Sequence, residues 1–196
     1  MKSIQVIARQ IEEALVRIEV AFEKFLPVDR DSWSDMDVLL KATDEYIGAL
    51  ETVGEYKGIR IVNYRDHLLA MLSVLPGVPG AAIVAPMNES VIIVNDEFEK
   101  LPEDLKEALL EHEYAHHMFS DITAIAEMGQ DSYIRDCLRG DGAGFDIELR
   151  ADAASKAAGF PIKEALTYLR TTMIDAEVPA ITQLAIDSIT LRIDAL

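Results

Sequence analysis

Apolar residues recur at intervals of three and four along both ends of the chain, which is the period of an amphipathic α-helix. The first stripe ends at Pro27 and the second at Gly54, two residues that commonly terminate helices. Two such helices in succession predict a helical hairpin over residues 1–55. Further stripes beyond the middle of the chain predict helices near 121–138, 146–158, 162–175 and 178–194.

The middle of the chain has a different texture. Three short runs, IRIVNY, AAIVAP and SVIIVND, are rich in β-branched residues, and the helical pattern RDHLLAMLSVL stands between the first two. Only MNE separates the last two runs, so we expect a small sheet that ends in a hairpin. Pro102 then begins another helix, with Glu103 and Asp104 beside the positive end of its dipole. Together with a loop at Arg139–Gly144, the pattern predicts a predominantly helical α+β fold.

Composition and charge narrow the classes of partner. The chain has 196 residues, 50% of them hydrophobic, which is enough to bury a sizeable core. Its formal net charge is −17, whereas nucleic-acid affinity comes mainly from cations that neutralise phosphates. We therefore expect no nucleic-acid partner. The composition does not indicate which oligomeric state the protein adopts.

Three features bear on location. The segment MKSIQVIARQIEEALV interleaves charged residues with apolar ones, where a signal peptide has an unbroken apolar region. The longest apolar run, MLSVLPGVPGAAIVAP, is cut by prolines and glycines and is too short to span a bilayer. The lone Cys137 can form no internal disulfide. These features predict a cytoplasmic protein with no membrane partner.

Three of the four histidines fall in the segment ALLEHEYAHHMF. His112 and His116 are four residues apart on one helix face, with Cβ atoms about 5 to 6 Å apart, so one cation can touch both. Glu113 lies about a quarter-turn from His112, where its carboxylate can reach a water held by that cation. This spacing is that of His-Glu-x-x-His zinc hydrolases, in which the glutamate takes a proton from the activated water.

The alternative is a helix whose inward face carries two ordinary core histidines. Three apolar residues share that face, so both imidazoles are expected to point inward. Burying two imidazoles beside a carboxylate is costly unless a shared partner satisfies them, which favours the metal. His117 points away from the other two, and we assign it to the surface or to a hydrogen bond behind a ligand. The inward apolar residues are Leu105, Leu109 and Phe119.

A catalytic zinc usually has three protein ligands and one open position. Phe119 and Ile122 stand where the extended metzincin pattern requires glycine and histidine, so that arrangement is excluded. In FDIELRADAASKAAGF, Glu148 can complete the site, and Asp152 can accept the second ring N–H of His112. Small residues on the same face, Ala151 and Ser155, allow this helix to approach the histidine helix. A chain with 35 acidic residues also offers Asp146, Asp121 and Glu127 as the third ligand.

The sequence HEYAH, followed by ELRADAAS and a closing glycine, resembles the gluzincin class of zinc metallopeptidases. The resemblance covers roughly residues 80–160 and is closest in texture to small soluble bacterial and phage peptidases and to HtpX-type catalytic cores. It implies a zinc cofactor and a zincin-like core with a small sheet beside the active-site helix. The implied residues are His112, His116 and Glu148 as metal ligands, Glu113 as general base and Asp152 behind the first histidine.

The helical and β-rich patterns, taken together with the resemblance, predict a division of the chain. Residues 56–160 would form the catalytic core, residues 1–55 the helical hairpin, and residues 161–196 helices packed on the core. Two departures from the family pattern stand out. Ala115 replaces a glycine found in many members, and a glycine-rich loop lies within the 31 residues between His116 and Glu148.

The strand before the histidine helix suggests how substrate binds. In such folds an edge strand beside the active-site helix adds an extended peptide to the sheet. This assigns Val91, Ile92 and Ile93 of SVIIVND to substrate binding. Oxyanion stabilisation has three unranked candidates, Tyr133, Tyr168 and Arg150.

The leading hypothesis is therefore a zinc-dependent metallopeptidase that acts on a peptide or protein substrate, with Glu113 as general base. A second hypothesis is a zincin-fold structural or partner-binding module with little or no catalytic turnover, prompted by the large share of helix outside the core. A third is a helical structural protein that carries the motif by chance.

Overall fold

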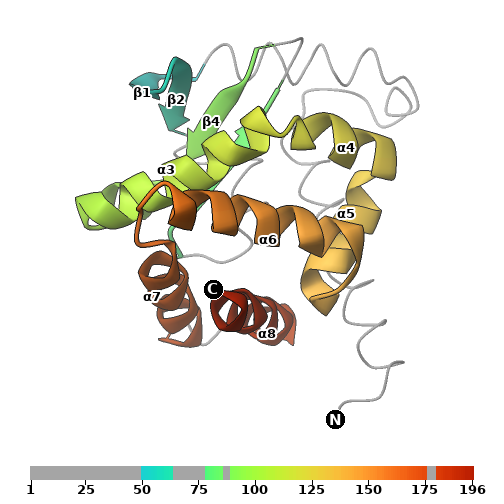
Figure 1. Ribbon diagram of the computed structural model, residues 1–196. Coiled ribbons are helices and arrows are strands. Elements are labelled where there is room, and N and C mark those ends of the chain that lie inside the picture. Colours follow the sequence, from blue (N-terminus) through green and yellow to red (C-terminus); the bar gives the residue numbers. More distant parts are fainter. Residues whose placement is uncertain (1–49, 64–77, 86–88, 176–179) are drawn as a thin grey trace, which may run out of the picture.

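The computed structural model describes residues 50–63, 78–85, 89–175 and 180–196 (Figure 1). These segments contain one small sheet followed by a run of helices. The strands are β1 (Thr52–Tyr56), β2 (Ile59–Asn63), β3 (Ala81–Val84) and β4 (Val91–Val94). The helices are the 3-10 turn η4 (Phe98–Lys100) and the α-helices α3 (Glu103–Met118), α4 (Asp121–Met128), α5 (Gln130–Arg139), α6 (Gly142–Ala157), α7 (Ile162–Asp175) and α8 (Ala180–Ala195).

The four strands form a mixed sheet in the order β1-β2-β4-β3. β1 and β2 are antiparallel and joined by a tight turn in which Lys57 and Gly58 have positive φ angles of 48° and 84°. Such a turn matches the natural twist of a hairpin. β4 is parallel to β2 and antiparallel to β3. The expected pairing of the last two β-rich runs is therefore confirmed.

The position of β4 corrects one prediction. SVIIVND was expected to supply an edge strand, but β4 is hydrogen-bonded on both sides and its four residues are almost completely buried. Its unbroken VIIV run is typical of a strand covered on both faces. The assignment of Val91, Ile92 and Ile93 to an open substrate-binding edge is therefore wrong. In the described sheet, the edge nearest to α3 is β3.

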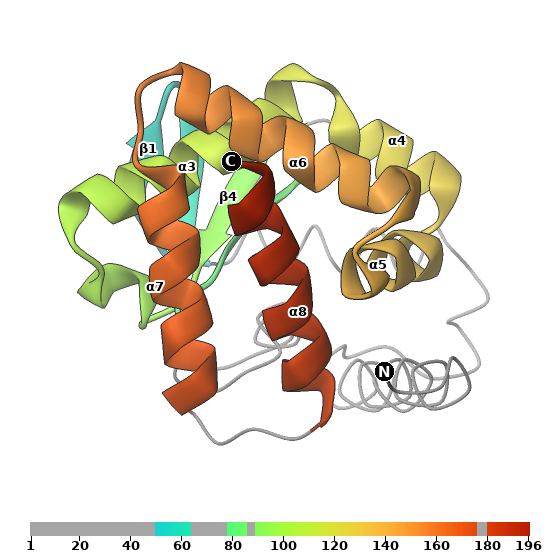
Figure 2. The ribbon, with the colours of Figure 1, turned by 60° about the horizontal axis from the view of Figure 1, so that its bottom comes forward.

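The hydrophobic core lies between the sheet, α3 and the two C-terminal helices. Ile92 of β4, Leu109 of α3, Leu166 of α7 and Ile189 of α8 belong to one buried cluster. Figure 2 shows α7 and α8 side by side and α6 running along α3. The described segments contain no helix that is both long and apolar enough to cross a bilayer.

α6 approaches α3 closely because small residues form the contact. Ala108 of α3 and Ala151 and Ser155 of α6 are completely buried. The Ser155 hydroxyl donates a hydrogen bond of 2.9 Å to the carbonyl oxygen of Ala108. This close contact, expected from the sequence, sets the separation between the two helices that carry the candidate ligands.

Three helix boundaries differ from the sequence prediction. The stripe expected to continue as helix to Gly54 instead becomes strand β1 from Thr52, since this segment pairs with β2. The single helix expected over 121–138 is split into α4 and α5 at Gly129, whose φ of 87° is incompatible with a continuous helix. α6 begins at Gly142 and not near residue 146, so the loop before it is shorter than expected.

The early start of α6 has a local cause. The carboxylate of Asp136 on α5 accepts a hydrogen bond of 3.1 Å from the N–H of Gly144, in the first turn of α6. This acceptor satisfies one of the free N–H groups of a helix start. The expected helix at 162–175 is confirmed, and the one at 178–194 is present as α8. The helices expected within residues 1–49 and in RDHLLAMLSVL lie outside the described residues.

Candidate metal centre

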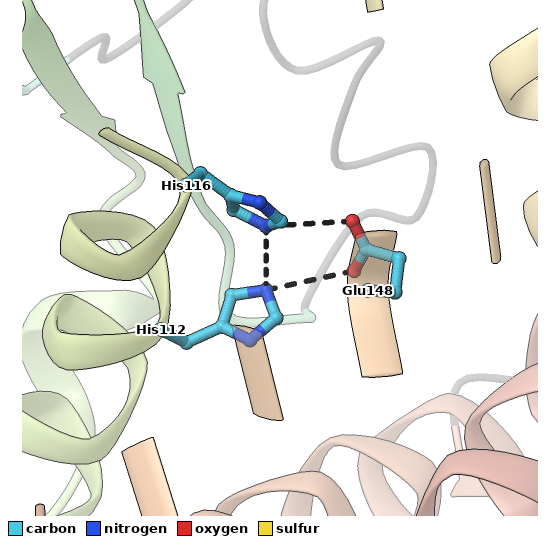
Figure 3. A group of neighbouring side chains, drawn as sticks. All are labelled: His112, His116 and Glu148. Atoms are coloured by element: carbon cyan, nitrogen blue, oxygen red, sulfur yellow. Dashed lines mark hydrogen bonds and ion pairs between the residues drawn. The ribbon is translucent and has the colours of Figure 1, made fainter. Parts of the chain in front are cut away.

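Two histidines of α3 and one glutamate of α6 converge on one point (Figure 3). The Nε2 atoms of His112 and His116 are 3.0 Å apart. The carboxylate of Glu148 faces both, with Oε2 at 3.5 Å from His112 Nε2 and Oε1 at 3.5 Å from His116 Nε2. All three side chains are buried. Within the described segments, no other group of histidine, cysteine or acidic side chains has such metal-binding geometry.

These separations fit a single tetrahedral cation. Zinc bonds of 2.0 to 2.1 Å place the ligand atoms of a tetrahedral site about 3.3 Å apart. The three observed separations are 3.0, 3.5 and 3.5 Å. Two imidazole nitrogens and a carboxylate oxygen are also a common donor set of catalytic zinc sites. The residues present therefore fit a metal ion.

Only one of the four third-ligand candidates reaches the two histidines. Asp146 and Glu127 are exposed on the surfaces of their helices. Asp121 is completely buried, but it lies behind His116, with its Oδ2 atom 2.9 Å from His116 Nδ1. Glu148 alone faces the two Nε2 atoms from the opposite side.

An aspartate lies behind each imidazole. His112 Nδ1 is 2.9 Å from Asp152 Oδ1, a close contact that is poorly aligned for a hydrogen bond. His116 Nδ1 and Asp121 Oδ2 are also 2.9 Å apart and form a hydrogen bond. Such partners orient the imidazole so that the other ring nitrogen faces the metal. The sequence analysis predicted the contact of Asp152 with His112. It considered Asp121 only as a third ligand and did not predict its contact with His116.

An arginine pairs with each of these aspartates. Arg150 donates to Asp121 Oδ1 and lies over the ring of Phe119. Arg192 donates two hydrogen bonds of 2.7 Å to the carboxylate of Asp152. Its Nη1 atom also lies 2.8 Å from Glu148 Oε2. The site thus contains two His-Asp-Arg series, one on each candidate ligand histidine.

Sequence reasoning missed Arg192. One feature of the sequence could have drawn attention to this residue: Arg192 is the only basic residue after Arg170. It also shares a helix face with Ser188 and Ile189, which are both buried in the structure. A basic residue on the buried face of a helix needs a buried acidic partner. The sequence could have raised that requirement, but it could not have identified the partner.

These charges shift the pKa values of the site. Burial lowers the pKa of His112, but the adjacent carboxylates of Asp152 and Glu148 outweigh it and raise the value to about 10. Burial raises the pKa of Glu148, but the Arg192 guanidinium and the two imidazoles hold it well below the ordinary value. Burial also raises the pKa of Asp152, but Arg192 and His112 outweigh it and lower the value to about 2. A histidine binds a metal in its neutral form, so metal binding at this site would be coupled to the loss of any proton that His112 carries on Nε2.

Glu113 lies between this site and the sheet. Its Oε2 atom accepts a hydrogen bond of 2.8 Å from the backbone N–H of Ile83 in β3. Burial raises the pKa of Glu113, and the charges of the two histidines partly offset the shift. A carboxylate with a raised pKa is closer to the range in which it can act as a general base. Glu113 therefore stands beside the metal triad without joining it.

A cavity of about 470 Å³ opens beside these residues. It is lined by the triad and Glu113, by the edge strand β3, and by residues of α4 and α5. The wall on α4 and α5 is mainly apolar. Its apolar residues are Ile122, Ile125, Ala126 and Ile134.

The three candidates for oxyanion stabilisation differ in their position relative to the cavity. Tyr133 lines the cavity, and its hydroxyl donates a hydrogen bond to Glu148 Oε1. Tyr168 lies on α7 at a separate surface depression. Arg150 is engaged by Asp121. Only Tyr133 therefore has a hydroxyl at the metal site.

Two further residues of the histidine segment, His117 and Phe119, are exposed. His117 is exposed and forms a 2.8 Å hydrogen bond with Ser90, in agreement with its assignment to the surface. Phe119 was expected on the inward face, but this residue is 45% exposed. The reason is that α3 ends at Met118, so Phe119 does not follow the helical stripe.

Comparison with known proteins identifies no relative: no family model, curated protein or solved structure matches the chain significantly. The resemblance to gluzincins therefore depends on the motif residues and on the geometry described above.

Proposed function

We propose that this protein is a zinc-dependent metallopeptidase of gluzincin type, with a zincin-like core formed by the sheet, α3 and α6. The main support is the convergence of His112, His116 and Glu148 at zinc-binding separations beside Glu113. Zinc bound there would supply an activated water and an electrophile for the scissile carbonyl. The metal-site residues also line an accessible cavity, which a substrate needs in order to reach them.

Each residue around the triad has a defined task in this proposal. Glu113 takes a proton from the attacking water and passes it to the leaving amine. Tyr133 has its hydroxyl at the triad and donates a hydrogen bond to the developing oxyanion. Asp152 and Asp121 hold the ligand histidines in orientation.

The peptide substrate lies along β3. This strand is the edge of the described sheet beside the cavity, so its outer backbone groups are available to a further strand. The outward N–H of Ile83 donates a hydrogen bond to Glu113. When Glu113 turns to the water, that N–H becomes free for the substrate backbone. A side chain of the substrate then enters the apolar part of the cavity.

The same contact between Ile83 and Glu113 favours a second candidate function. A base that remains bound to the strand would not accept a proton, and the protein would then be a zincin-fold binding module with little or no turnover. Both candidates involve a peptide segment that adds to β3, and they differ only in cleavage.

The test is hydrolysis of a diverse peptide mixture by zinc-loaded protein, read by mass spectrometry. The metallopeptidase proposal expects defined cleavage products that disappear in the Glu113→Gln variant. Peptide binding to the wild type without any cleavage would favour the binding module. Cleavage at an undiminished rate by zinc-loaded Glu113→Gln would contradict the proposed mechanism.

A further inference from the structure

Arg192 reaches the metal centre from the last helix of the chain. Its Nε and Nη2 atoms each donate a 2.7 Å hydrogen bond to the carboxylate of Asp152, and Nη1 lies 2.8 Å from Glu148 Oε2. One guanidinium thus contacts the third metal ligand and the carboxylate behind the first ligand. Its side chain is only 14% exposed, so these contacts are shielded from water.

Arg150 provides an internal comparison. It also pairs with a buried aspartate behind a ligand histidine, Asp121. Its side chain, however, is 48% exposed and makes no ion pair with a residue of the metal triad. Among the lysine and arginine side chains of the described segments, Arg192 alone forms an ion pair with a triad residue.

The charge balance of the site explains why such a cation is needed. Glu148 and Asp152 are both buried, and two neighbouring carboxylates without a counter-ion repel each other and lose their hydration. A bound metal would supply positive charge at the same position. Arg192 supplies it from the chain itself, by holding Oε2 of Glu148 while Oε1 faces His116.

We propose that Arg192 is a built-in counter-ion of the metal-free site. It keeps Glu148 and Asp152 in place before the metal arrives, and its charge opposes that of the incoming ion. Arg192 is thus a positioning residue that makes folding independent of the metal and lowers metal affinity. This inference requires the metal site of the proposed function but does not require peptide hydrolysis.

The proposal predicts a coupling of definite sign between Arg192 and the metal. If two cations stabilise the same carboxylates, removal of one makes the protein more dependent on the other. Arg192→Gln removes the charge and retains a hydrogen-bond donor. It should lower the melting temperature of the metal-free protein by about 10 °C, because one partner of a buried ion pair is lost. The metal-loaded variant should lose much less, and its dissociation constant for zinc should fall at least about fivefold.

The experiment measures melting temperatures of the full chain by circular dichroism, first after chelation and then with one equivalent of zinc. The proteins are wild type, Arg192→Gln, Arg192→Lys and the matched control Arg150→Gln. Chelator competition gives zinc affinities for the variants that fold without metal. The rise in melting temperature on adding zinc should be largest for Arg192→Gln. Arg192→Lys retains the charge, so its rise should be close to that of the wild type. Arg150→Gln should show a smaller rise than Arg192→Gln, because Arg150 forms no ion pair with a triad residue.

The outcomes separate this inference from the proposed function. No zinc-induced rise in the wild type would refute the metal site itself. A wild type that responds to zinc, together with an Arg192→Gln variant destabilised equally with and without zinc, would refute only the counter-ion role and make Arg192 a packing anchor of α8. Failure of Arg192→Gln to fold even with zinc would also refute it, whereas folding only with zinc would support it. Unfolding of the wild type upon chelation would equally overturn the proposal.

Discussion

The Nδ1 atom of His116 lies 2.9 Å from the Oδ2 atom of Asp121, only five positions further along the chain. This contact is possible because Ser120, between α3 and α4, adopts a left-handed conformation with φ of 57°. The reversal turns the first residue of α4 back toward the last turn of α3. A local backbone feature therefore supplies the carboxylate that contacts the second candidate ligand histidine.

Replacement of Asp121 by asparagine should weaken zinc binding about 10- to 100-fold, because the amide is a poorer partner for the imidazole N–H. Competition with a chromogenic chelator measures the affinity. Asp146→Asn, an exposed position on α6, is the matched control and should bind zinc like the wild type. Equal affinities for Asp121→Asn and the control would show that the contact does not orient His116.

Tyr133→Phe tests the proposed oxyanion donor. Loss of one such donor typically lowers kcat about 10²- to 10³-fold, with little change in KM. The hydroxyl also bonds Glu148, so zinc content must be measured in parallel and should remain near that of the wild type. Tyr168→Phe alters a tyrosine outside the cavity and should leave kcat unchanged. An increase in KM without a decrease in kcat would assign Tyr133 to substrate binding instead.

The apolar wall of the cavity predicts a substrate preference. Peptides with a large aliphatic or aromatic side chain next to the cleaved bond should be hydrolysed faster than peptides with a charged one. Ile125→Ala removes part of this wall and should lower kcat/KM for the preferred peptide about 10- to 100-fold. Ile174→Ala, at an exposed position on α7, serves as the control. If the preference is unaffected by Ile125→Ala, the side chain of the substrate binds elsewhere.

The contact between α3 and α6 predicts an effect on both stability and metal binding. Ala151 is completely buried in this contact, and leucine there should overpack it and cost about 1 to 3 kcal/mol of unfolding free energy. Because the contact sets the position of Glu148, zinc affinity should fall as well. Chemical denaturation and chelator competition measure the two effects. Ala153→Leu, exposed on the same helix, should change neither quantity. Unaltered stability in Ala151→Leu would mean that the helices can move apart freely.

The residues of the candidate site were predictable to the extent that they obey short-range spacing. The helical period placed His112, His116 and Glu113 together, and the pair Glu148 and Asp152 was recognised by the same period. Ala151 and Ser155 indicated which face of the second helix approaches the first. In the structure these residues lie together as the spacing suggested.

The contributions missed from the sequence depend on long-range packing or on backbone reversals. Arg192 meets Asp152 across 40 residues, through the packing of α8 on α6, and no local pattern encodes that pairing. Asp121 depends on the left-handed Ser120, which is uncommon for a residue other than glycine. These two residues complete the series behind the histidines.

In the sheet, too, local sequence predicted the strands but not their order. The β-rich runs predicted the strands β2, β3 and β4, but their order depends on a crossover that composition does not determine. β4 pairs with β3 on one side and with β2 on the other. The run SVIIVND therefore forms a central strand, and β3 forms an edge of the sheet. β1 was missed because its short segment TVGEY continued an apparent helical stripe.

The most direct test of the account is the zinc content of the purified protein, measured by elemental analysis without added metal or a histidine tag. The variants are His112→Ala and Glu148→Ala, with His117→Ala as a control outside the triad. The account predicts about one zinc per chain in the wild type and in His117→Ala, and almost none in the other two. A wild type without zinc after reconstitution, or unchanged zinc in His112→Ala and Glu148→Ala, would contradict it.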